Sequence, residues 1–144
     1  MRKFFILVFV VCLVFGSSVA LGAGDFQKDC DMIMGYLRSD LAAIDAQYIV
    51  FDDGVWISGI LAMSEAELRR VQIENPAQVN KLLASMTEMS ESMSESFQKM
   101  FSTLGYTDKN FGFMMYTEDG IPILISYNGE ALLNWAVSVT KRAN

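Results

Sequence analysis

The sequence predicts an α+β domain in which an antiparallel sheet of two β-hairpins packs against about four helices. Apolar residues recur every three or four positions in several long segments, which is the spacing of one helix face. Shorter segments rich in β-branched and aromatic residues occur in two pairs. An Asp-Gly dipeptide separates the members of each pair and favours a tight turn. The expected element order is α-β-β-α-α-β-β-α.

The N-terminal segment, residues 1–23, is predicted to be a secretory signal peptide. Arg2 and Lys3 give a positive start, residues 4–15 are apolar throughout, and residues 16–23 are rich in small side chains. An uncleaved membrane anchor is the alternative, but a span needs about 20 apolar residues and this core is shorter. We therefore expect a periplasmic or secreted protein whose residues 24–144 form a single compact domain.

The first element expected in this domain is a helix over about residues 25–45. Phe26, Cys30 and Ile33 begin an apolar stripe with spacings of four and three. Cys12 lies within the predicted signal peptide, so Cys30 has no cysteine partner in the mature chain. Because the stripe faces inward and aspartates flank Cys30, we expect a buried, unreactive thiol.

A hairpin and two helices are expected next. Residues 47–52 and 55–62 have strand composition and flank Asp53-Gly54. Ser64 and Glu67 have the spacing of a capping box, which predicts a helix over about residues 65–73. Asn75 followed by Pro76 predicts the start of a long helix, which Gly105 would end.

Residues 111–117 and 121–127 make the second predicted hairpin, around Asp119-Gly120. Pro122 lacks a backbone donor, which places it in an edge strand or at the start of a strand. Asn128 is expected to cap a last helix over about residues 129–141. Its inward side would present Leu132, Leu133, Trp135 and Val139.

Composition and charge exclude several function classes. Without Arg2 and Lys3 the mature chain holds nine basic and 17 acidic residues, a net charge of −8. Such a surface repels nucleic acid and anionic lipid, so neither nucleic acid nor, after signal cleavage, a membrane is an expected partner. The chain has no His, which excludes His-dependent triads and most zinc sites. No glycine-rich phosphate loop is present, and no cofactor or catalytic residue is predicted.

Two alternatives that involve chemistry remain. An enzyme built on carboxylates or on an oxygen-ligated metal would need acidic residues from different elements to converge. A copper-handling protein would use thioethers, for which the methionines of the long helix are candidates. Flexible Met side chains also fill irregular cores, so a packing role is favoured for these residues. The candidate metal ligands are Met86, Met89 and Met93.

The predicted strands are apolar on both faces, whereas a sheet covered on one side normally alternates apolar and polar residues. Either helices cover both faces, or one face is left for a partner. Trp56, Tyr116 and Tyr127 suit a binding face because their rings offer area and their polar atoms remain satisfiable. The sequence thus favours a small, acidic, non-catalytic binding protein, whose partner would be a protein, a second copy or a small apolar ligand.

Overall fold

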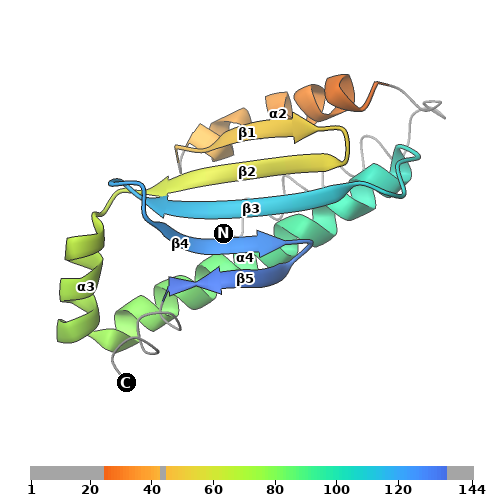
Figure 1. The fold of residues 1–144 in the computed structure, drawn as a ribbon. Helices are drawn as coiled ribbons and strands as arrows, with labels where there is room; N and C mark the ends of the chain where they lie inside the picture. Colours follow the sequence, from red (N-terminus) through yellow and green to blue (C-terminus); the bar gives the residue numbers. More distant parts are fainter. Residues whose placement is uncertain (1–24, 43–44, 136–144) are drawn as a thin grey trace.

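The computed structural model describes residues 25–42 and 45–135, which form an α+β fold with three helices and one five-stranded mixed sheet (Figure 1). The predicted α+β class is confirmed. The spatial order of the strands follows the chain, β1-β2-β3-β4-β5. The elements are α2 (Phe26–Ala42), β1 (Gln47–Phe51), β2 (Gly54–Leu61), α3 (Glu65–Glu74), α4 (Pro76–Thr103), β3 (Asn110–Thr117), β4 (Pro122–Tyr127) and β5 (Glu130–Asn134).

The prediction of an all-antiparallel sheet is wrong at its centre. β2 and β3 pair in parallel, from Gly54 opposite Asn110 to Leu61 opposite Thr117, whereas the other neighbouring strands are antiparallel. A parallel pair requires a long crossover connection, and α3 with α4 supplies it. The two hairpins are therefore joined by the pairing of their inner strands.

The predicted last helix is also wrong over its first part, where the chain forms β5 instead. Asn128 and Gly129 both have positive φ, 51° and 86°. Two consecutive residues in that region make the tight turn that joins antiparallel strands, so Asn128 is a turn residue and not a helix cap. Leu132, expected on the inward side of the helix, is exposed. Residues 136–144, including Val139, lie outside the described residues.

The first hairpin turns one residue earlier than expected. Phe51 pairs with Gly54, so Asp52 and Asp53 make the turn and Gly54 begins β2. Gly54 is required there because a Cβ would lie 2.2 Å from the carbonyl oxygen of Asn110. The second hairpin turns around Asp119-Gly120, as predicted, with φ of 81° at Gly120.

The helix boundaries encoded by local caps are confirmed. Ser64 Oγ accepts a hydrogen bond from the amide of Glu67, and the Glu67 carboxylate accepts one from the amide of Ser64. Asn75 accepts from the amide of Gln78 and precedes Pro76 at the start of α4. Just beyond the end of α4, Gly105 has a φ of 90°.

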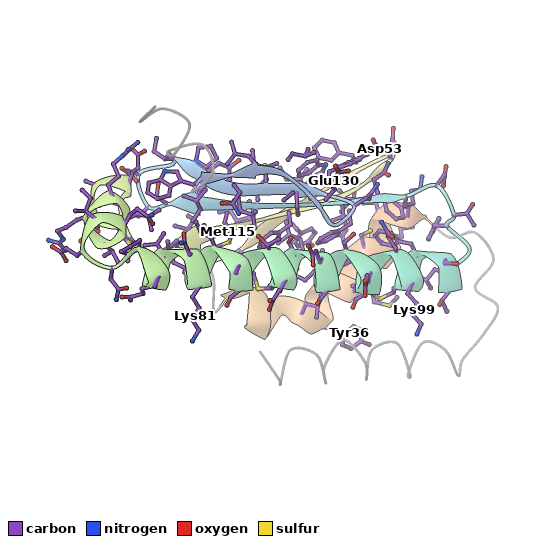
Figure 2. The ribbon with its side chains drawn as sticks, turned by 90° about the horizontal axis from the view of Figure 1, so that it is seen from below. Tyr36, Asp53, Lys81, Lys99, Met115 and Glu130 are labelled. Carbon is purple, nitrogen blue, oxygen red and sulfur yellow. The ribbon has the colours of Figure 1, made fainter. Side chains whose placement is uncertain are left out.

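The three helices differ in how they contact the sheet. α2 packs against β1, α4 packs against β3, β4 and β5, and α3 packs against α4. Both α2 and α4 lie on one face of the sheet, and Figure 2 shows that face from the side, with Met115 between the sheet and α4. The core forms in this layer. Its largest fully buried side chains include Ile33, Leu37, Ile57, Leu83, Phe97, Phe101, Phe111, Phe113 and Ile123.

The predicted signal peptide, residues 1–23, lies outside the described residues. Within the described part of the chain, no helix has both the length and the apolar character needed to cross a membrane. The burial expected of Cys30 is confirmed, because its side chain has no exposed surface.

Candidate binding surface on the open sheet face

The sheet has a second face, turned away from α2 and α4, which we call the open face (Figures 1 and 2). Paired residues on neighbouring strands point to the same side of a sheet, so the strand registers define this face as four rows. The rows are Phe51-Gly54-Asn110, Ile49-Trp56-Gly112-Tyr127-Glu130, Gln47-Ser58-Met114-Ile125-Leu133 and Ile60-Tyr116-Pro122.

Trp56 is at the centre of the open face. A Cβ on Gly112 would lie 2.1 Å from Cδ2 of Trp56, so the indole occupies the space above this glycine. On the far side of Gly112 the indole stacks on Tyr127, with ring centroids 5.7 Å apart and planes at 30°. The absence of a side chain at residue 112 therefore lets aromatic groups from β2 and β4 meet across β3.

The structure brings the three residues predicted for binding, Trp56, Tyr116 and Tyr127, to the open face. They come from three different strands, and each is partly exposed. Tyr116 lies two rows along the sheet from Trp56 and Tyr127, in the row of Ile60 and Pro122. Its hydroxyl is 3.2 Å from the sulfur of Met114. Both residues share one face of β3, because they are two positions apart in the strand.

Aliphatic and aromatic residues extend the open face toward β1. Ile49 is 60% exposed, Phe51 is 49% exposed and Ile60 is 40% exposed. These are large apolar side chains on neighbouring strands, not isolated ones. They make the β1 side of the open face both apolar and accessible to solvent.

A shallow hollow of about 190 Å³ lies at the end of the open face where β3 enters its hairpin. The Tyr116 ring and Ile60 provide its apolar wall. The lining also includes the acidic residues Asp45 and Glu118 and the polar residue Ser58. Gln47, Thr117 and Gly120 complete the lining.

Acidic residues surround the sheet. Asp52 and Asp53 form the turn of the first hairpin, Glu118 and Asp119 lie in the second, and Glu130 begins β5. The Asp119 carboxylate accepts a hydrogen bond from the amide of Glu65 at 3.0 Å. Hydrogen bonds from the Thr117 side chain and from this amide hold the pKa of Asp119 below its usual value.

The acidic pair on α2 forms hydrogen bonds within the fold. Asp29 accepts from the hydroxyl of Tyr106 at 2.7 Å, and Asp31 accepts from the hydroxyl of Tyr48 at 3.0 Å. Burial and the Asp29 carboxylate raise the pKa of Tyr106 to about 12. Among the described residues, no three His, Cys, Asp or Glu side chains converge in a way that would hold a metal ion. The acidic pair on α2 thus links this helix to β1 and to the loop before β3.

Cys30 lies between these two aspartates. Burial, followed by the negative charges of Asp29 and Asp31, raises the pKa of its thiol to about 12. At neutral pH the sulfur is therefore protonated and weakly nucleophilic.

The methionines considered as copper ligands lie along α4 on the core side. Met86 and Met93 are buried, and Met89 is partly buried against the same core. Leu83 and Phe97 share their layer of packing. These contacts are those of side chains that fill the space between α4 and the sheet.

A larger groove of about 450 Å³ lies between the end of α4 and the start of β3. Its lining is largely polar. Asn128, one of the lining residues, donates a side-chain hydrogen bond to Asn110 and accepts one from the amide of Phe111. The remaining lining residues are Gln98, Ser102, Tyr106, Thr107, Asp108 and Lys109. The hydrogen bonds of Asn128 serve to close the β4–β5 turn against β3.

Sequence reasoning identified the aromatic residues of the open face but missed Gly112, Ile49 and the hollow. A glycine within an otherwise apolar strand is the feature that could have pointed to the close approach of another group at residue 112. The hollow combines residues that are far apart in the sequence, and only the strand registers bring them together.

Comparison of the chain with protein-family models, curated proteins and solved structures found no match.

Proposed function

We propose that this protein is an exported, non-catalytic binding protein that holds a partner on the open face. The observation that supports the proposal is the open face itself, an aromatic and aliphatic surface spread over five strands on the side away from α2 and α4. Clustered exposed apolar residues are uncommon on soluble monomers and usually mark a site of interaction.

The residue types on this face fit a binding role. Trp and Tyr are enriched among the residues that dominate binding energy, because they bury large areas and retain a polar atom for hydrogen bonding. Trp56 and Tyr127 provide this chemistry at the centre, and Ile49 and Phe51 flank them on the β1 side.

The central pair is also preorganised. Trp56 is held between the backbone of Gly112 and the ring of Tyr127, so its conformation is fixed before a partner arrives. A side chain that is already ordered loses less conformational entropy on binding. This arrangement favours recognition of one defined surface over non-specific adhesion.

Export is the second part of the proposal. It rests on the positive, apolar and small-residue segments within residues 1–23. Mass spectrometry of the protein recovered outside the cytoplasm should find a new N-terminus between about residues 21 and 25. Recovery of the intact chain would refute cleavage.

The binding role can be tested in the cell that makes the protein, by placing a photoreactive amino acid at Ser58 in the centre of the open face. The matched control places it at Ala84, an exposed residue of α4. We expect a discrete crosslinked species from residue 58 only. Equal crosslinking from both positions, or none from residue 58, would contradict the proposal.

Substitutions then identify the residues responsible. Trp56→Asp, Tyr116→Asp and Tyr127→Asp should each abolish the crosslink at residue 58 and leave the circular dichroism spectrum unchanged, because these side chains already contact water. Ile73→Asp is the control, since Ile73 is a large exposed apolar residue of α3 outside the open face. If all three open-face variants unfold, these rings belong to the core and the proposal fails.

A further inference from the structure

We infer that the partner of the open face is a polypeptide segment whose apolar or aromatic residues are flanked by Lys or Arg, one of which enters the hollow beside Tyr116. This inference rests on the function proposed above and specifies the chemistry of the partner. It follows from the distribution of charge over the two sides of the molecule and from the size and lining of the hollow.

The charge on the sheet and its loops is almost entirely negative. Between residues 45 and 63, and again between residues 104 and 135, Lys109 is the single basic residue. The acidic residues in these two segments are Asp45, Asp52, Asp53, Asp108, Glu118, Asp119 and Glu130. An apolar surface with an acidic rim attracts cationic partners and repels anionic ones.

Lys109 does not offset this charge on the open face. Its ammonium group donates to the carbonyl of Asp52 and lies 5.0 Å from the centre of the Phe26 ring. Its side chain is only 16% exposed. The Lys109 side chain therefore contacts the first hairpin and α2.

The other basic residues between positions 45 and 135 belong to α3 or α4. Figure 2 shows Lys81 and Lys99 pointing away from the sheet, whereas Asp53 and Glu130 lie on the sheet side. Lys81 and Lys99 of α4 thus lie on the side opposite the apolar, acid-rimmed face.

The hollow has the lining that a cationic side chain needs. Asp45 and Glu118 bring two negative charges to its lining, and Tyr116 brings an aromatic ring, the group that forms cation–π contacts. Ile60 provides an apolar wall for the methylene groups of a Lys or Arg side chain. Its volume of about 190 Å³ is below the range of about 300–1,000 Å³ typical of small-molecule sites, so it suits one side chain rather than a whole ligand.

The same charges disfavour a second copy of the chain as the occupant. β1 is an edge strand, and antiparallel pairing of two β1 strands centred on Ile49 would place Asp53 opposite Asp45 of the other copy at both ends. Like charges that face each other across strands are destabilising. Two chains that are both strongly acidic also repel each other at a distance.

The first test uses synthetic peptides that share one apolar and aromatic pattern and differ only at flanking positions, which are lysine, glutamine or glutamate. Binding to the full mature protein is followed by tryptophan fluorescence, with Trp56→Phe to identify the contribution of the open face. We expect the affinity to fall in the order lysine, glutamine, glutamate. The lysine peptide should lose affinity as salt rises, because ions screen exposed charges.

The second test is the double variant Asp45→Asn and Glu118→Gln, which keeps the shape of the hollow and removes its charge. Affinity for the lysine peptide should fall about twofold to thirtyfold, the range for two exposed ion pairs. Affinity for the glutamine peptide should stay unchanged. The control is Glu88→Gln with Glu95→Gln, which removes two charges from exposed positions on α4 and should have no effect.

The outcomes separate this inference from the proposed function. If the glutamine or glutamate peptide binds as tightly as the lysine peptide, or if no peptide binds, the inference is overturned. The proposed function still stands in that case if the crosslink at residue 58 depends on Trp56. A crosslink between two copies of the chain would replace the cationic partner with self-association. Loss of both peptide binding and the crosslink would refute both.

Discussion

The indole of Trp56 lies directly over Gly112, so that a Cβ at residue 112 would be 2.1 Å from the ring. Gly112→Ala should therefore displace Trp56 from its stack on Tyr127. We expect a loss of about 1–3 kcal/mol in the free energy of unfolding, as for other overpacked sites. Chemical denaturation measures the loss, and a shift in tryptophan fluorescence reports the displaced ring.

Gly35→Ala is the matched control for this substitution. Gly35 lies within α2, and a Cβ there would have no neighbouring atom within 4 Å. Replacing it should stabilise the protein by up to about 1 kcal/mol, the difference in helix propensity. A neutral Gly112→Ala variant with an unchanged fluorescence spectrum would show that Trp56 does not occupy this space.

Cys30 should be unreactive in the folded protein, because burial and its two neighbouring aspartates raise the pKa of the thiol to about 12. A thiol reagent at neutral pH should label it only after denaturant is added. Cys30→Ala should lower the free energy of unfolding by about 1 kcal/mol or somewhat more, as a small truncation in the core does. Rapid labelling of the native protein would contradict the buried position.

Gly129→Ala tests whether residues 130–134 form a strand. In the structure Gly129 has a φ of 86°, which costs a residue with a Cβ about 1–2 kcal/mol, so the variant should be less stable. A Cβ there would meet Ser94 at 3.5 Å, an ordinary contact, so the cost comes from the backbone. If this segment began a helix, the same substitution would stabilise the protein. The sign of the change in thermal unfolding decides between the two.

The stability of the protein should fall in acid in part through Asp119 and Glu67. Hydrogen bonds lower the pKa of both carboxylates in the folded protein. Their contribution is present above the pKa of the unfolded chain and is lost as pH falls through the folded pKa. Asp119→Asn and Glu67→Gln should each flatten the decline in stability below about pH 5. Urea denaturation at several pH values measures this, with Glu88→Gln as the control on an exposed face of α4.

The methionines of α4 should tolerate replacement by leucine. Met93 is buried and Met89 is partly buried against the core, and Leu has a similar volume. The double variant Met89→Leu and Met93→Leu should lose less than about 1.5 kcal/mol per site and keep its binding properties. Titration with Cu(I) tests the alternative that these methionines bind copper. Tight binding by the wild type that the double variant lacks would show that these sulfurs are metal ligands.

The sequence predicted correctly the starts of α3 and α4, which depend on interactions between neighbouring residues. The capping box of Ser64 and Glu67 and the Asn75-Pro76 pair predicted where α3 and α4 begin. These predictions hold because the atoms that form each cap lie within three residues of one another. The β-branched and aromatic composition of the segments beside the Asp-Gly turns placed Trp56, Tyr116 and Tyr127 on strands, but did not show that they share one face.

What sequence reasoning missed depends on long-range contacts or on competing local preferences. No residue near β2 in the sequence predicts its parallel pairing with β3, because the direction of β3 is set by the long α4 that precedes it. Glu130, Ala131 and Leu132 all favour helices, and the Asn128-Gly129 turn overrides that preference. Intrinsic propensity is a weak guide where a turn and a neighbouring strand already fix the backbone.

The parallel pairing of β2 with β3 also governs the course of folding. Gly54 and Asn110 are 56 residues apart and become neighbours only after the whole of α3 and α4 has been placed between them. Bringing distant segments together costs loop-closure entropy before their contacts can stabilise the fold. This cost slows folding. Until then, the hairpin of β1 and β2 has two unpaired edges and an unprotected apolar surface. A chain truncated before residue 110 should aggregate, because it keeps these strands and lacks the one that completes the centre of the sheet.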